Sequence, residues 1–318
     1  MKTKPMTKFA ILALSLVLVA CAGGGSEEAG CPAIDGREIN VVATTPMIGE
    51  FVSQVGGEKI NLTVLMPPEA NPHTYEPAPQ DAGTIAEADL VFYTGLLYEP
   101  AALVKLLENS ACSTDILSEV GESVFPIEFK EGGHDDHEGH NHGAYDPHFW
   151  FDPSRVAYAA EYIESRLIEF DPENESSYKS SADSFVSELN DLTKQVSELI
   201  STVPSQNRKL ITTHESLGYL EAKFGLEVLS TIIPSLNSAN EISPSDLAGV
   251  IDVIEDNNVK VIFIESEAPS VYSETIVAET GIKSVTGLYV ETLKPGQSYS
   301  EFLISNVTLI TENLQDTD

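Results

Sequence analysis

Four of the seven histidines in this chain fall within nine residues, between Gly132 and Gly143. This segment, called here the His-rich loop (residues 132–143), alternates imidazoles with carboxylates and contains no apolar residue, so it cannot pack into a core. Neutral imidazoles and carboxylates suit Zn²⁺ best among the abundant ions, and Cu²⁺ or Ni²⁺ less selectively. We therefore expect a surface loop that collects metal ions with low affinity; a solvated acidic loop is the alternative. Its histidines are His134, His137, His140 and His142.

The other three histidines are isolated and lie near the ends of expected strands. His73 stands in Asn-Pro-His-Thr-Tyr-Glu-Pro, His148 in Asp-Pro-His-Phe-Trp-Phe-Asp-Pro, and His214 in Thr-Thr-His-Glu-Ser-Leu-Gly-Tyr. A lone histidine commonly serves as a cap or a hydrogen-bond donor. Three together suggest a shared site, because ligands of open α/β sheets bind at the carboxyl ends of the strands.

Short β-rich runs alternate with amphipathic stretches in the first half of the chain. Strands are expected at 39–45, 62–66, 89–93 and 123–127, and helices at 81–88 and 99–108. Alternation of this kind is typical of a parallel sheet covered by helices on both faces. Residues 36–171 are therefore predicted to form an N-terminal α/β lobe that carries the His-rich loop.

One long helix is predicted at 172–203, where apolar residues recur in steps of three and four. Pro172 opens this segment and Pro204 closes it. About thirty residues at 1.5 Å each reach roughly 45 Å, which is enough to brace two lobes. A coiled-coil dimer helix is the alternative.

The β-α alternation resumes after Pro204. Strands are expected at 209–213, 226–231, 259–265 and 284–288, and helices at 245–257 and 270–280. This second set forms a C-terminal lobe, residues 204–318, about as long as the first. The predicted fold class is α/β, with two similar lobes containing parallel sheets joined by one long bracing helix.

The first residues have the composition of an export signal. Three lysines precede an apolar run at 9–20 that is too short to span a bilayer, so residues 1–20 are read as a signal peptide. The run ends in Leu-Val-Ala before Cys21, which looks like a bacterial lipobox with lipidation at Cys21. Residues 21–35 would then be a lipidated tether, and the protein would be exported and lipid-anchored on the outer side of the cytoplasmic membrane. An ordinary secretory signal with an incidental cysteine is the alternative.

Two further cysteines remain once Cys21 is assigned to lipid. Cys31 and Cys112 make a plausible disulfide in an oxidising compartment.

The net charge of −33 argues against nucleic acid as a partner. So acidic a surface repels anionic lipid headgroups and raises the local concentration of cations, without selecting one of them.

These segments resemble those of the bacterial zinc- and manganese-binding solute-binding lipoproteins of ABC transporters, over the chain from about residue 39 to its end. The resemblance implies an extracytoplasmic carrier, not an enzyme, that delivers Zn²⁺ to a membrane permease. It also implies that His73, His148 and His214 are ligands. The fourth position in the family is a carboxylate or a water, and Glu291 in Leu-Tyr-Val-Glu-Thr-Leu stands where the family usually has Asp.

The choice between zinc and manganese also follows from the resemblance. Manganese-selective relatives usually place a carboxylate where this chain has His214, and manganese favours harder oxygen ligands. Zinc is therefore expected over manganese, and a manganese-binding carrier of the same family is the alternative. A monomer is the expected oligomeric state.

Ligand imidazoles are neutral and are usually oriented by a partner on the other ring nitrogen. The candidate partners near in sequence are Asp146, Asp152, Glu76 and Glu215. Metal binding should weaken as pH falls through about 6.5, the unperturbed histidine pKa, because protons then compete for the rings.

A zinc-dependent hydrolase is the rival from another class, because three histidines with an open fourth position also suit a catalytic site. The sequence contains neither a His-Glu-x-x-His motif nor a Gly-x-Ser-x-Gly motif, which argues against it. A surface adhesin or structural protein in which metal only stabilises the fold is a third possibility, and it would unfold without the ion.

Overall fold

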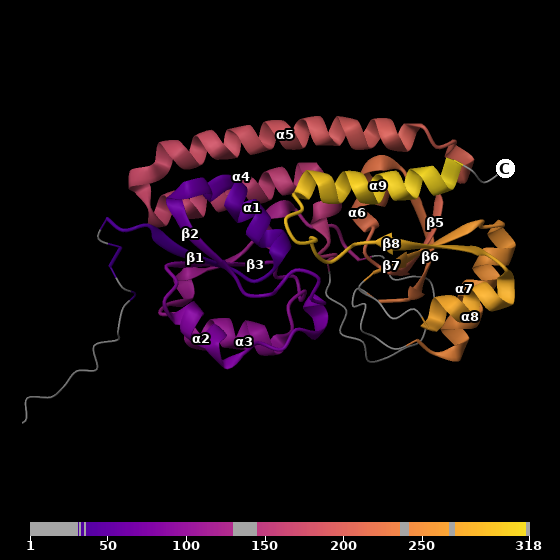
Figure 1. Cartoon of the computed structure of the whole chain (residues 1–318), viewed down its shortest axis with the longest axis horizontal. Helices are drawn as coiled ribbons and strands as arrows, with labels where there is room; N and C mark the ends of the chain where they lie inside the picture. The colour runs from indigo at the N-terminus through magenta and orange to yellow at the C-terminus, as the bar shows by residue number, and fades with distance from the viewer. Residues whose placement is uncertain are drawn as a thin grey trace, which may run out of the picture. The chain divides into compact units, whose positions relative to one another are not determined.

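Two sets of parallel strands, each flanked by helices, make up the structure, a computed structural model (Figure 1). It describes residues 31, 33–34, 36–129, 145–235, 242–266 and 271–315. The expected signal peptide 1–20, the lipidation site Cys21, most of the tether and the His-rich loop lie outside the described residues. Residues 31–318 form one compact unit.

The N-terminal lobe is built on a four-stranded parallel sheet in the order β2-β1-β3-β4. Its strands are β1 (Ile39–Ala43), β2 (Ile60–Val64), β3 (Leu90–Tyr93) and β4 (Leu117–Glu119). Its helices are α1 (Pro46–Gly56), α2 (Pro79–Ala86), α3 (Ala101–Ser110) and α4 (Pro153–Phe170).

Apolar residues on both faces of β1 explain why helices cover the sheet on both sides. Val41 packs into the cluster that includes α1 and α4, whereas Val42 packs into the cluster that includes α2 and α3. Successive side chains of a strand point to opposite faces, so a continuous apolar run needs cover on both. The close approach of α1 to β2 requires Gly49, because a Cβ there would lie 2.5 Å from Val64 Cγ2.

Helix α5 (Glu175–Ser201) is the predicted long helix and follows a short 3₁₀ turn, Pro172–Asn174. It packs against α1 and α4 and also against α9 (Tyr299–Gln315), and Figure 1 shows it running along both lobes. Its buried side chains recur at steps of three and four, as expected of one apolar stripe. They are Tyr178, Ala182, Phe185, Leu189, Leu192, Val196 and Ile200.

The C-terminal lobe is built on two pairs of parallel strands. Its strands are β5 (Lys209–His214), β6 (Glu227–Ile233), β7 (Val261–Glu265) and β8 (Lys283–Leu288), and its further helices are α6 (Gly218–Phe224), α7 (Pro244–Asn257) and α8 (Val271–Thr280). Parallel ladders join β5 to β6 and β7 to β8, and β5 lies beside β7. The four strands therefore lie as two hydrogen-bonded pairs, β6-β5 and β7-β8, in an arrangement similar to that of β2-β1-β3-β4. The predicted fold class, with two similar lobes and one bracing helix, is confirmed.

The expected strand at 123–127 is wrong. The fourth strand of the first sheet is β4, and residues Gly121–Val124 form a 3₁₀ helix instead. Pro126 has no backbone N–H to donate to a ladder, and proline within an apolar run demotes it as a strand.

Cys31 and Cys112 are joined by a disulfide across a sequence separation of 81 residues. The bond ties the start of the described chain to the segment just after α3. No helix within the described residues is both long enough and apolar enough to cross a membrane.

The disulfide is expected to stabilise the fold. Replacing both cysteines by serine (Cys31→Ser with Cys112→Ser) should lower the free energy of unfolding by about 2–4 kcal/mol, because a long loop is no longer closed in the unfolded chain. Urea unfolding of the oxidised protein and of the double variant measures this difference. Reductant should shift the urea midpoint of the parent protein to that of the variant and should not change the midpoint of the variant. Equal urea midpoints for the oxidised parent and the variant would contradict the expectation.

Candidate metal centre

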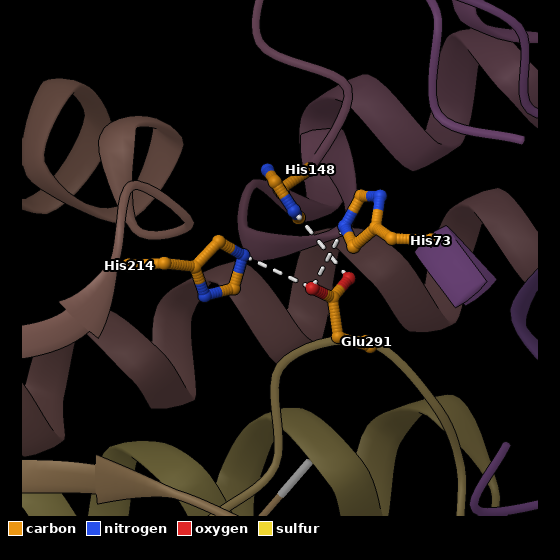
Figure 2. Close-up of side chains that lie close together, drawn as sticks. All are labelled: His73, His148, His214 and Glu291. Carbon is orange, nitrogen blue, oxygen red and sulfur yellow. Dashed lines mark hydrogen bonds and ion pairs between the residues drawn. The ribbon is translucent and has the colours of Figure 1, made fainter. Parts of the chain in front are cut away.

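Four side chains from distant parts of the sequence converge on one small volume (Figure 2). They are His73, His148, His214 and Glu291, and one potential ligand atom of each lies within 4.8 Å of those of the others. The side chain of His73 is 3% exposed and the other three are fully buried. The residues that the sequence singled out as ligands are thus brought together.

Each lobe contributes two of these residues. His73 lies in a 3₁₀ turn (Pro72–Thr74) that follows β2, and Asn71 fixes the turn by accepting a hydrogen bond from the His73 N–H at 2.9 Å. His148 immediately precedes the 3₁₀ turn Phe149–Phe151. From the C-terminal lobe, His214 is the last residue of β5, and Glu291 follows the end of β8.

The Glu291 carboxylate lies at the centre of the group. Its Oε1 is 3.0 Å from Nε2 of His73 and 3.0 Å from Nε2 of His214, and its Oε2 is 3.5 Å from Nε2 of His148. In a tetrahedron with metal–ligand bonds of about 2.0–2.1 Å, ligand atoms lie about 3.3 Å apart. The separations of Oε1 from the two imidazole nitrogens are therefore close to those of atoms that surround one small ion.

Two of the imidazole nitrogens are buried without an aligned hydrogen bond. Within the described residues, Nε2 of His148 and Nε2 of His214 have no hydrogen-bond partner, although both lie close to Glu291. A buried nitrogen without a partner is costly, because it has lost its contacts with water. An ion held between the rings and the carboxylate would satisfy both nitrogens.

Each of these two rings contacts a further carboxylate through its other nitrogen, Nδ1. Nδ1 of His148 lies 2.8 Å from Oδ1 of Asp146, and Nδ1 of His214 contacts Oε2 of Glu265. The backbone N–H of each histidine also donates to the same carboxylate, at 2.8 Å for His148 and 3.1 Å for His214. Such partners fix the ring and leave Nε2 free to face the centre.

Of the four partners considered from the sequence, only Asp146 contacts a ring of the group. Asp152 caps α4 through the N–H of Ser154, Glu215 accepts a hydrogen bond from the Thr231 hydroxyl, and Glu76 is exposed. Glu265 was missed. The sequence does indicate this residue, because Glu265 is the only acidic residue of the apolar strand β7 and lies at its carboxyl end, where ligands bind.

The C-terminal lobe also supports the partner of His148. The Tyr219 hydroxyl donates to the Asp146 carbonyl at 2.9 Å. A Cβ on Gly218 would lie 2.6 Å from Asp146 Oδ2, so the first residue of α6 must be small for the carboxylate to keep its place.

Aromatic residues hold the segment that carries Glu291. The Tyr98 hydroxyl lies 3.0 Å from Oε2 of Glu291 and 3.0 Å from its carbonyl oxygen. Trp150 Nε1 donates to the Val290 carbonyl at 2.9 Å, and the Tyr299 hydroxyl donates to the Trp150 carbonyl at 2.7 Å. Sequence reasoning missed these roles, because the contacts join residues far apart along the chain.

Charges in the buried group reinforce one another. Burial disfavours charge on His148, but its hydrogen bond to Asp146 and the nearby Glu291 outweigh this effect and raise its pKa to about 9. Burial likewise opposes charge on His214, yet Glu265 and Glu291 raise its pKa well above the usual value. Burial alone would raise the pKa of Glu291, whereas His73 and His214 hold it well below its usual range.

These shifts change the expected pH dependence. A raised histidine pKa means that protons compete with a metal ion at higher pH than for a free histidine. Competition should therefore begin below about pH 9, the pKa of His148, and not below 6.5 as the sequence alone suggested.

Metal loading should release protons from His148 and His214. At pH 7.5 we expect the release of more than one proton per ion, compared with about 0.3 if all three rings kept a pKa near 6.5. Calorimetry in buffers of different ionisation enthalpy measures this number. Asp146→Asn should reduce the number of protons released, because it lowers the pKa of His148. The control is Asp171→Asn, which changes a carboxylate that accepts a hydrogen bond from Tyr178 and should leave the number unchanged. A parent value near 0.3 would contradict the raised pKa values.

Comparisons with known proteins agree with this architecture. The family described as zinc-uptake complex component A, periplasmic, matches residues 41–313. The chain is 28% identical to the manganese ABC transporter substrate-binding lipoprotein PsaA of Streptococcus anginosus, covering 98% of this chain and 99% of that one. It is also 28% identical to the high-affinity zinc uptake system protein ZnuA of Bacillus subtilis, covering 96% of both.

The fold has a solved counterpart. The periplasmic zinc-binding protein TroA of Treponema pallidum superposes with a TM-score of 0.77 at 22% sequence identity, covering 87% of this chain and 99% of that one. Because the family match spans most of the sequence, the chain belongs to the family of the periplasmic component A of zinc-uptake complexes.

Proposed function

We propose that this protein is the extracytoplasmic substrate-binding component of a metal ABC transporter, and that it captures Zn²⁺ between its lobes and delivers it to a membrane permease. The metal is the cargo, and no chemical turnover is involved. The observation that carries the proposal is the buried group of three imidazoles and one carboxylate, with two Nε2 atoms that have no aligned hydrogen bond.

The donor set supports zinc as the cargo. Zinc commonly takes four ligands in a tetrahedron and accepts imidazole nitrogen together with a carboxylate oxygen. Manganese favours oxygen ligands and lies at the weak end of the affinity order for such sites. His73, His148 and His214 would supply the nitrogens and Glu291 the oxygen; the burial of Glu291 beside the rings supports a carboxylate, and not a water, as the fourth ligand.

Manganese is the second candidate cargo, because relatives are named for each of the two ions. The relative from Streptococcus anginosus is named for manganese, whereas the one from Bacillus subtilis is named for zinc at the same identity. The fully buried Glu291 is a hard oxygen donor that both ions accept.

Transport and location follow from the same relatives. These relatives are named as substrate-binding lipoproteins of metal ABC transporters, which supports a place outside the cytoplasmic membrane and a membrane permease as the partner of this protein. For this chain we propose residues 1–20 as the signal peptide, Cys21 as the lipidated residue and 21–35 as the tether. We also propose that the protein works as a monomer and is not an enzyme.

The remaining proposals concern the domain boundaries and the accessory metal sites. Residues 36–171 would form one lobe, 172–203 the linking helix and 204–318 the other lobe. In the His-rich loop, His134, His137, His140 and His142 would bind ions weakly and separately from the buried centre.

Two variants separate the buried centre from the loop. Metal-free protein beginning at Ala22 should bind one Zn²⁺ tightly, and Mn²⁺ at least about 100-fold more weakly. His214→Ala should weaken the tight site by more than about 100-fold, beyond the loss typical of an outer partner. Deleting 132–143 should remove only weak sites. Competition with a chromogenic chelator measures the tight site and calorimetry the weak ones.

The outcomes distinguish the candidates. Tight zinc binding that persists in His214→Ala but is lost when the His-rich loop is deleted would mean that the tight site lies in the loop, and the assignment of the buried ligands would be wrong. Tighter binding of manganese than of zinc by the parent protein would mean that manganese is the cargo, and the assignment of the site residues would still hold.

A further inference from the structure

Glu291 presents two oxygens to different surroundings, and this asymmetry bears on which ion the site selects. We propose that Tyr98 is a specificity-determining residue: its hydroxyl holds Oε2 of Glu291 away from the ion, so that Glu291 binds through Oε1 alone and the centre stays four-coordinate, which favours zinc over manganese. The inference rests on the proposed function of the buried centre.

The contacts of the carboxylate carry the first step. Oε1 lies 3.0 Å from Nε2 of both His73 and His214, so these three atoms can occupy three corners of one tetrahedron of ligands. Oε2 lies 3.0 Å from the Tyr98 hydroxyl and farther, at 3.5 Å, from His148 Nε2. A hydroxyl donating to an ionised carboxylate makes a strong, charge-assisted hydrogen bond. Oε1, which faces two of the imidazoles, is thus the oxygen placed to bind the ion, while Oε2 is held by the Tyr98 hydroxyl.

The position of Tyr98 is fixed by its surroundings. Its side chain is 1% exposed, and its ring packs edge-on against His73, His148 and Trp150. Its hydroxyl also lies 3.0 Å from the Glu291 carbonyl oxygen, so the contact is anchored to the backbone of the same residue. A ring held on several sides cannot turn away when the ion arrives.

The backbone that carries Tyr98 is also held in place. Leu96 and Leu97 have φ of 53° and 64°, in the left-handed region that residues other than glycine seldom adopt. The buried Glu99 carboxylate accepts hydrogen bonds from the N–H groups of Thr94 and Gly95 at 2.7 and 2.9 Å. Strain that surrounding contacts sustain is typical of segments that place a functional group.

Coordination number is what makes this contact selective. Zinc is satisfied by four donors in a tetrahedron. Harder divalent ions such as manganese favour more oxygen ligands and an octahedral arrangement. A carboxylate that binds through both oxygens would supply a fifth donor. Tyr98 opposes this binding mode for every ion. The absence of the fifth donor weakens the binding of manganese only, because zinc is satisfied by four donors.

The test compares Tyr98→Phe with Tyr178→Phe. Both replacements remove a buried hydroxyl that donates to a carboxylate, but the partner of Tyr178 is Asp171, outside the metal centre. Tyr98→Phe should weaken zinc binding by about 10-fold, as is typical when an outer partner is lost. It should leave manganese binding unchanged or tighter, so that the ratio of zinc to manganese affinity falls by about 10-fold or more. Tyr178→Phe should leave both affinities unchanged.

Cobalt(II) is the spectroscopic probe of coordination number. A tetrahedral Co²⁺ centre absorbs visible light much more intensely than a five- or six-coordinate one, and Co²⁺ accepts the same donors as zinc. The Co²⁺-loaded parent and Tyr178→Phe proteins should show the intense tetrahedral bands. Tyr98→Phe, and Tyr98→Leu as a second replacement, should lose them.

The outcomes bear on the inference and on the proposed function separately. Equal weakening of zinc and manganese in Tyr98→Phe, with the tetrahedral bands retained, would mean that Tyr98 only positions Glu291, and the inference fails. Absence of a tight metal site in the parent protein would instead overturn the proposed function. A lowered affinity ratio together with the loss of the bands supports the role of Tyr98.

Discussion

The constraint on which this structure depends is the burial of three imidazoles and a carboxylate in one small volume. Removing charged groups from water is costly unless each is paired. The protein meets this requirement with carboxylates behind the rings, Asp146 for His148 and Glu265 for His214, and with Glu291 between them. The two lobes, the close approach of Gly218 and the aromatic residues around Glu291 all serve to bring these groups together and to exclude water from them.

Sequence separation explains which parts of the site could be predicted. Asp146 stands two residues from His148 and was named as a partner from the sequence, whereas Glu265 lies 51 residues from His214 and was not. Tyr98 lies 193 residues from Glu291, and no local pattern points to that contact. The convergence of the three isolated histidines followed from strand ends and from family resemblance, because chain spacing alone does not bring residues 73 and 291 together.

The fold was more predictable than the site because it rests on local patterns. The apolar runs of β1, β3 and β7 are buried, and the stripe of α5 repeats every three to four residues, so both were visible in the sequence. The strand expected at 123–127 failed because an apolar run with Pro126 lacks a donor that the ladder needs. The similar arrangement of strands in the two lobes was predicted only as a general similarity of the lobes, since which strands lie side by side is a long-range property.

The four residues of the candidate metal centre come from well-separated points along the chain, two from each lobe. An ion bound to all four would therefore act as a reversible cross-link between segments that otherwise meet only in the folded state. By mass action, a ligand present at 1,000 times its dissociation constant adds about 4 kcal/mol to the stability of the fold. Loaded protein would then unfold far less often than empty protein, so its resistance to unfolding would depend on the concentration of free metal.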